Sequence, residues 1–186
     1  MFTVRRLLSC WVFMLTACST TTTSNHALTE TDPKPNVLLS RSTEKVALRF
    51  TPEVPETFDI SVKTFFSNSG KIAVSKWHET LSKGFQNGIG SFFASAPTPA
   101  DADLTFLIRL ATPDMFDEPL GGGAVSVLRL RFQVELIDSK GKSVRQWADS
   151  VMSTPDAYSE SEKLRTAVEA MYEKIAKTVP PPVATQ

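Results

Sequence analysis

Apolar and polar residues alternate along several stretches of the chain, which is the pattern of half-buried β-strands. The alternation is longest at 125–138, where every second residue from Leu128 to Leu136 is apolar. A turn sequence follows at 138–141, so the next stretch is expected to return beside 125–138 as a hairpin. The expected strands cover residues 46–50, 102–111, 125–138 and 143–152, with shorter candidates at 58–62 and 72–74.

A spacing of three or four residues between apolar positions predicts two helices. Residues 75–94 carry one such stripe, and residues 159–178 carry the other, which opens with a Ser–Glu capping box. The first helix contains Gly84, Gly88 and Gly90, each of which weakens a helix by about 1 kcal/mol relative to alanine. Either these glycines allow close packing against another element, or burial of the apolar stripe simply tolerates them.

These elements follow one another in the order β-α-β-β-β-α and predict an α+β domain, with an antiparallel sheet of about four strands and two helices packed on one face. Residues 112–123 interrupt this order, because two prolines and three consecutive glycines disfavour regular structure there. We therefore expect a long loop that carries Met115, Phe116 and Leu120. Its apolar side chains either contact a partner or fold back onto the edge of the core.

The N-terminus has the composition of an export signal. Arg5 and Arg6 precede a run at 7–15 that is almost wholly apolar and that is too short to span a bilayer as a helix. The run ends in Leu15-Thr16-Ala17-Cys18. An ordinary secreted protein cleaved after Ala17 is the alternative that this sequence leaves open.

The four residues that end at Cys18 resemble the lipobox of bacterial lipoproteins. The resemblance implies that the Cys18 thiol receives a diacylglycerol and that cleavage leaves Cys18 as the first residue. Several acyl chains on one residue would anchor the chain stably, whereas one chain binds a membrane only marginally. Ser19 in place of an aspartate implies the outer membrane, on its periplasmic side, although the inner membrane remains open.

The chain therefore divides into four expected parts. They are a signal peptide at 1–17, a disordered Thr/Pro-rich tether at 18–36, a single α+β domain at 37–180 and a disordered tail at 181–186. Once Cys10 is removed with the signal and Cys18 is acylated, the domain has no thiol for a disulfide, for catalysis or for a metal. The formal charge is near zero, so nucleic acid is not an expected partner.

The remaining residues predict no catalytic constellation. The chain has two histidines, of which His26 lies in the expected tether and His78 on a helix. Acidic residues gather at 114–118 without the spacing of a calcium loop. We therefore expect no enzyme, no cofactor and no metal site.

The outer face of the expected hairpin is a second candidate contact surface. Arg129 and Arg131 alternate with the apolar residues of 125–138, and Trp147 on the returning strand is expected to lie over them. Such a face is either merely solvated, or it binds a partner protein or a polysaccharide.

The order of elements after the lipobox resembles small envelope lipoproteins of the YajG kind, and more loosely those of the LptE and PelC kinds. The similarity covers the helix around 81–93, the hairpin from Leu128 to Trp147 and the closing helix at 164–175. It implies a non-catalytic interaction or assembly component of a cell-envelope complex, whose partners are the membrane, envelope proteins and possible further copies of the chain. The alternative is a periplasmic carrier that binds a lipid or a glycan between sheet and helices.

Overall fold

The computed structural model describes residues 25–29, 31–63, 69–120 and 123–179. Cys18, the expected signal peptide and the expected tail lie outside these ranges. The described residues form eight strands, two α-helices and two short 3-10 helices. The strands are β1 (Asn25–Leu28), β2 (Lys45–Phe50), β3 (Phe58–Lys63), β4 (Ser69–Val74), β5 (Ala94–Ser95), β6 (Leu104–Leu120), β7 (Gly123–Asp138) and β8 (Ser143–Met152). The helices are α1 (Trp77–Asn87) and α2 (Glu160–Ala176), with 3-10 turns η1 (Ile89–Phe92) and η2 (Pro99–Asp101).

The sheet is organised around β6, which pairs along its whole length with β7 in antiparallel register. β8 continues the meander beyond β7, as the predicted hairpin requires. On its other side, β6 pairs in parallel with β2 near its start and with β3 at Met115. The sheet therefore has a five-stranded part, β8-β7-β6-β2-β5, and a three-stranded part, β3-β4-β1.

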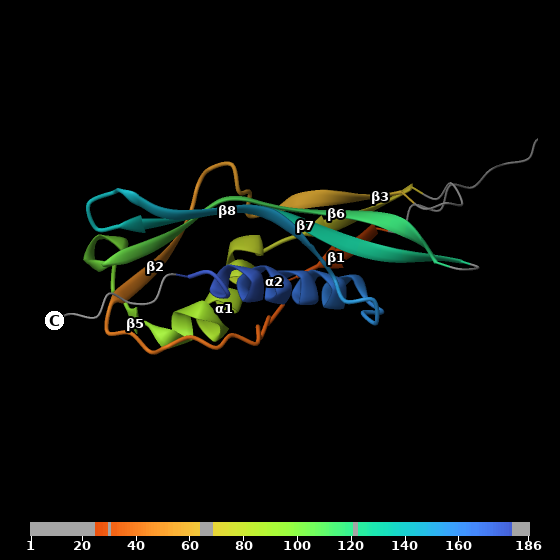
Figure 1. Ribbon diagram of the computed structural model, residues 1–186. Helices are drawn as coiled ribbons and strands as arrows, with labels where there is room; N and C mark the ends of the chain where they lie inside the picture. The colour runs from red at the N-terminus through yellow and green to blue at the C-terminus, as the bar shows by residue number, and fades with distance from the viewer. Residues whose placement is uncertain (1–24, 30, 64–68, 121–122, 180–186) are drawn as a thin grey trace, which may run out of the picture.

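Both α-helices lie on one face of this sheet (Figure 1). Their buried side chains meet those of the strands in one core, whose largest fully buried members include Trp77, Tyr172, Phe106 and Phe132. Two internal hydrogen bonds satisfy the buried aromatic donors: Trp77 Nε1 donates to the Ala111 carbonyl at 3.0 Å, and the Tyr172 hydroxyl donates to the Leu81 carbonyl at 2.8 Å. The α+β class and the single helical face are as predicted.

The predicted sheet of about four antiparallel strands is wrong in size and in direction. The described sheet has eight strands, and the pairs β1–β4, β2–β5, β2–β6 and β3–β6 are parallel. Alternation along one strand depends on which face is buried, and it carries no information about the direction of the neighbouring strand. The sequence pattern therefore located most strands without determining their partners.

The predicted long loop at 112–123 is also wrong. β6 continues to Leu120 and β7 begins at Gly123, so the hairpin extends well beyond the helices (Figure 1). Pro113 pairs opposite Leu130. Leu128, two residues earlier on β7, directs its backbone toward β8, where its carbonyl accepts from Ser153. By alternation the backbone of Leu130 also faces β8, so Leu130 exchanges no hydrogen bonds with the residue opposite it on β6. That residue is Pro113, whose missing N–H is therefore not needed for pairing with β7.

The ordered domain begins earlier than residue 37, so the predicted tether is wrong from Asn25 onward. β1 pairs with β4, and the following chain makes hydrogen bonds to both α1 and α2. The Lys34 and Asn36 amides donate to Glu169 and Glu173 of α2, both at 2.8 Å. Pro33, Pro35 and Val37 are buried along this path. The polar composition of this segment predicted disorder. That prediction failed because the segment is held by contacts with α1 and α2, which its own composition does not reveal.

The predicted helix at 75–94 is shorter than expected. α1 ends at Asn87, and η1 continues the path after a break at Gly88. A Cβ at Gly88 would lie only 2.5 Å from Cγ of Pro35, which places the incoming chain directly against this residue. The helix therefore ends where the N-terminal segment crosses it.

Candidate functional site

The edge of β2 opposite β6 is only partly covered. β5 pairs with Lys45 and Val46, and among the described residues no strand continues this pairing beyond Val46. The Lys45 carbonyl accepts from Asp103 on the β6 side, whereas the Val46 carbonyl accepts from Ala96 on the β5 side. Because backbone groups of a strand alternate in direction, the N–H and C=O of Leu48 face the open edge.

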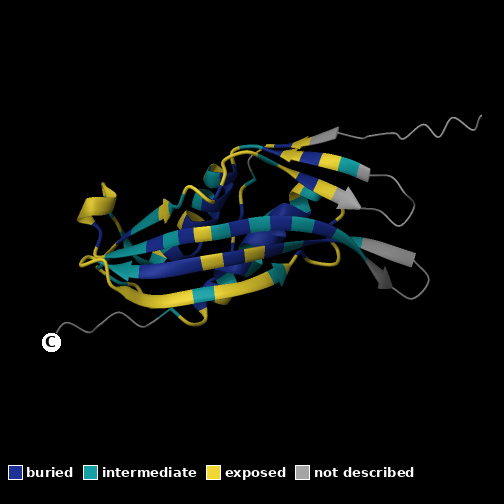
Figure 2. Cartoon of the chain, turned by 90° about the horizontal axis from the view of Figure 1, so that it is seen from above, coloured by how far each residue is buried: buried dark blue, intermediate teal, exposed yellow. Residues whose placement is uncertain are grey.

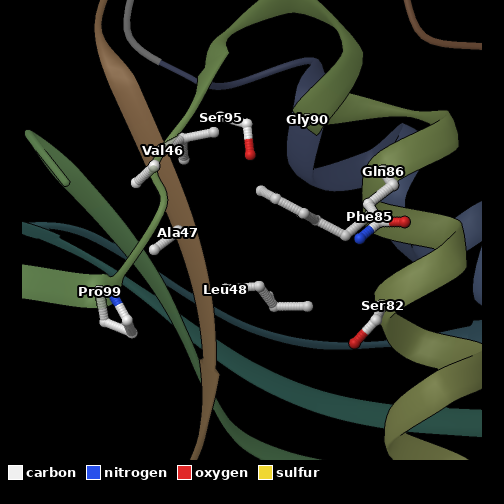
Figure 3. A pocket seen from close by; sticks show the side chains of 10 residues that line it. Val46, Ala47, Leu48, Ser82, Phe85, Gln86, Gly90, Ser95 and Pro99 are labelled. Carbon is white, nitrogen blue, oxygen red and sulfur yellow. The ribbon is translucent and has the colours of Figure 1, made fainter. Parts of the chain in front are cut away.

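A groove of about 350 Å³ lies between this edge and α1. Figure 3 shows Leu48 of β2 and Phe85 of α1 reaching toward each other across it. Ser82, Gln86 and Ser95 add polar groups around these apolar side chains. The groove thus combines free backbone groups, an apolar contact and polar side chains, and we call it the β2–α1 groove.

His78 of α1 and Phe50 of β2 lie beside the groove, each next to a lining residue of its own element. Their rings stack at 4.2 Å between centroids with planes 2° apart, and His78 Nε2 is 2.7 Å from the Val54 carbonyl oxygen. His78 precedes Ser82 by one helical turn, and Phe50 follows Leu48 on the same face of β2. This histidine therefore has a packing role beside the groove.

Such a groove matches the requirements for binding an extended peptide. A strand laid along the open edge would exchange backbone hydrogen bonds with Leu48, and every second side chain would point to one side. A volume of this size accommodates a side chain or two and lies at the small end of ligand sites. The residues that line the groove include neither a carboxylate nor a histidine.

The three apolar residues predicted to form a contact loop have different surroundings. Met115 is buried in the core, with 6% of its surface exposed, so it belongs to the packing. Phe116 is half-buried and lies under the Arg129 guanidinium, whose Cζ is 5.3 Å from the ring centroid. The backbone of Leu120 pairs with Gly123, and its side chain lies outside the described part of the chain.

The predicted arginines lie on the outer face of the sheet. Arg129 Nε donates to Asp114 Oδ1 at 3.1 Å, and this hydrogen bond raises the pKa of Arg129. Arg131 is exposed on the same face, two residues along the strand. Asp114 of the acidic stretch at 114–118 is thus paired with an arginine of the neighbouring strand.

A second outer-face pair joins Arg109 to Glu135 at 2.7 Å from Nε to Oε2, and Gln146 donates to the other carboxylate oxygen at 3.1 Å. Glu135 is buried. Hydrogen bonds from Ser143 and Arg109 lower the pKa of Glu135, so the carboxylate is held in its charged form. This network stabilises the outer face across β6, β7 and β8.

Trp147 does not lie over the arginines, so the predicted cover is wrong. Trp147 pairs opposite Val134, which is buried beneath the helices, and therefore faces the helical side of the sheet. Its ring stacks on Phe106 at 6.1 Å, and its Nε1 donates to Thr178 Oγ1 at 2.7 Å. Alternation along β8 does not show which set of side chains is buried, because the strand has apolar residues on both faces.

The β2–α1 groove has no counterpart among the sites predicted from the sequence. The stretch at 46–50 was predicted as a half-buried strand, but its exposed edge depends on the brevity of β5, which has two residues. Pro97 and Pro99 stand directly after β5 and are the local signal that the pairing ends.

The described residues contain no group of three or more histidine, cysteine, aspartate or glutamate side chains placed to hold a metal ion. Within the same ranges, neither α-helix has the length and apolar character needed to cross a membrane.

No family model and no curated protein matches the sequence. Among solved structures, the chain is similar to a minor lipoprotein from Acinetobacter baumannii (16% identity, 73% of this chain and 90% of the other, TM-score 0.39). It is also similar to a PelC dodecamer from Paraburkholderia phytofirmans (13%, 73% and 90%, 0.35) and to a lipoprotein from Neisseria meningitidis (14%, 72% and 99%, 0.35). Likenesses this distant do not show the family of this chain.

Proposed function

We propose that this chain is a lipid-anchored, non-catalytic docking component of a cell-envelope complex. In this proposal Cys18 carries the anchor, and the domain faces the periplasm from the outer membrane. The β2–α1 groove receives an extended segment of a partner protein. The observation that carries the docking role is the free backbone edge at Leu48 beside that groove.

The lipobox at 15–18 supports the anchored location. Residues 18–24 precede β1, and this length of chain reaches at most about 25 Å when extended. An anchor at Cys18 would therefore hold the domain close to the membrane surface. A docking site near the bilayer favours partners that are themselves held at that surface, because their effective concentration there is higher.

The composition of the groove favours a peptide over a lipid. An acyl chain needs an apolar enclosure, whereas here Ser82, Gln86 and Ser95 line the groove beside the apolar groups. The space between sheet and helices, where a carrier would hold a lipid or a glycan, is occupied by fully buried side chains such as Trp77 and Phe106. We therefore place docking ahead of the carrier alternative.

Photo-crosslinking in living cells tests this proposal. The full-length chain carries a photoreactive amino acid in place of Gln86, and crosslinked products are located by mass spectrometry. We expect adducts in which one short segment of one envelope protein predominates. A synthetic peptide of that segment should bind the purified lipidated chain in detergent.

A matched pair of variants decides whether the groove is the docking site. Ser82→Trp fills the groove from α1, while Glu79→Trp adds the same side chain to an exposed position of that helix. We expect Ser82→Trp to abolish recovery of the partner and Glu79→Trp to preserve it, with both proteins folded by circular dichroism. Unchanged recovery with Ser82→Trp would reject the groove.

A further inference from the structure

β8 forms a free edge of the sheet over ten residues. It pairs with β7 alone, and Figure 2 shows it as an exposed strand along one margin of the sheet. An uncovered edge of this length is a template for pairing with another strand, and proteins usually protect such edges. Within the described part of the chain, no second strand pairs with β8.

The direction of the backbone groups on β8 follows from its register with β7. Ser153, just after β8, donates its amide to the Leu128 carbonyl at 2.7 Å and so faces β7. Alternation then directs the backbone of Trp147 toward β7, and that of Gln146 and Ala148 toward the free edge.

Part of this edge is satisfied within the chain. The Ser150 amide donates to Asp149 Oδ1 at 2.7 Å, and the Ser150 carbonyl accepts from Lys174 Nζ at 3.5 Å. Lys174 also forms an ion pair with Asp149. The backbone groups of Gln146 and Ala148, which precede Ser150 on β8, face the free edge and can pair with a partner strand.

The side chains around these two residues are complementary to a second copy of the same strand. If two copies of β8 pair in antiparallel fashion about Trp147, Gln146 of each copy lies opposite Ala148 of the other. Four backbone hydrogen bonds then form at the centre. In this register Arg145 of each copy lies directly opposite Asp149 of the other, so each end of the pairing has one ion pair.

We propose that this chain forms a two-fold symmetric dimer through β8, in the register that places Arg145 opposite Asp149 of the second copy. The sheet then continues across both copies, and the helices of both lie on the same face. The contact is limited to one strand from each copy, which is typical of a weak interface in solution. Attachment of both copies to one membrane would raise their effective concentration. This dimer does not depend on the β2–α1 groove.

Disulfide trapping in membranes tests the register. Two full-length chains with different tags, one with Gln146→Cys and one with Ala148→Cys, are produced together and oxidised. Opposite positions of an antiparallel pair lie within disulfide range, whereas diagonal positions are too far apart, so we expect about tenfold more linked dimer from the mixture than from either chain alone. Equal yields from the mixture and the single chains would indicate random collision and would overturn the proposal.

Charge exchange provides the second measurement. Arg145→Asp and Asp149→Arg each turn two attractive contacts into two repulsive ones. Each variant alone should therefore give at least about tenfold less linked dimer. A mixture of the two restores both attractions and should restore linkage of the cysteine pair. Thermal unfolding of each variant shows that it is folded. Failure of the mixture to recover, or linkage of β8 to a different protein, would reject a second copy as the partner.

Discussion

Gly84 of α1 lies directly against Tyr172 of α2. A Cβ at Gly84 would be 3.0 Å from Cε2 of Tyr172 and 2.9 Å from Cγ1 of Val168. Both of these side chains are buried, and the Tyr172 hydroxyl is held by the Leu81 carbonyl of α1. The sequence left open whether the glycines of this helix serve close packing, and at Gly84 they do, because the missing side chain sets the distance between the two helices.

Gly84→Ala is therefore expected to destabilise the domain, although alanine favours a helix by about 1 kcal/mol over glycine. Overpacking a filled core costs about 1–3 kcal/mol, and we expect the upper part of this range because both neighbours are buried. After the gain of about 1 kcal/mol in helix propensity, the net loss is about 1–2 kcal/mol. Urea unfolding of the purified mature protein measures this loss. Ser82→Ala on the same helix is the control and should change stability little; equal stability of Gly84→Ala and wild type would contradict the packing.

Met115→Ala distinguishes a core position from a contact position. Met115 is buried opposite Leu128, so its truncation leaves a cavity and should cost about 2–5 kcal/mol in urea unfolding. Phe116→Ala, at a half-buried outer-face position, should cost less. A loss of partner recovery with unchanged stability in Met115→Ala would instead support the contact surface that the sequence suggested.

The sequence predicted those parts of the fold that depend on local periodicity. The hairpin of β7 and β8, the capped helix α2 and the apolar stripe of α1 were all located from spacing alone. Ser159 caps α2 as predicted, since its Oγ accepts from the Glu162 amide at 3.2 Å. Parallel pairing could not be predicted in this way, because β2 and β6 meet only through contacts distant along the chain.

The candidate site was less predictable than the fold. Local alternation identified Arg129 and Arg131 as outer-face residues, which the structure confirms. Trp147 was placed on the wrong face because apolar residues of β8 occur on both faces, with Val144 and Ala148 on the face opposite Trp147, and nearly all of the strand is exposed. The β2–α1 groove depends on where β5 stops and α1 crosses, and no spacing within β2 carries that information.

Stability should fall at acidic pH through Glu135. Its pKa is lower in the folded protein than in the unfolded chain, so its contribution is fully present above the unfolded value and is lost as the pH falls through the folded value. Glu135→Gln should therefore be less stable than wild type at neutral pH, and the difference should close below about pH 4, the ordinary glutamate range. Urea midpoints at fixed ionic strength across this range measure the difference. Glu56→Gln on an exposed loop is the control, and a pH-independent gap for Glu135→Gln would rule out this ionisation as its cause.

The two cysteines of the chain provide a test of the lipid anchor. Acylation requires the thiol of Cys18 in the lipobox, whereas Cys10 belongs to the segment expected to be removed. Metabolic labelling with a fatty acid should therefore mark wild type and Cys10→Ser equally and leave Cys18→Ser unlabelled. Two or more acyl chains hold a protein on a membrane where one does so only marginally, so the labelled protein should sediment entirely with membranes. Label that persists in Cys18→Ser, or wild type without label, would leave the domain without the anchor on which its proposed location depends.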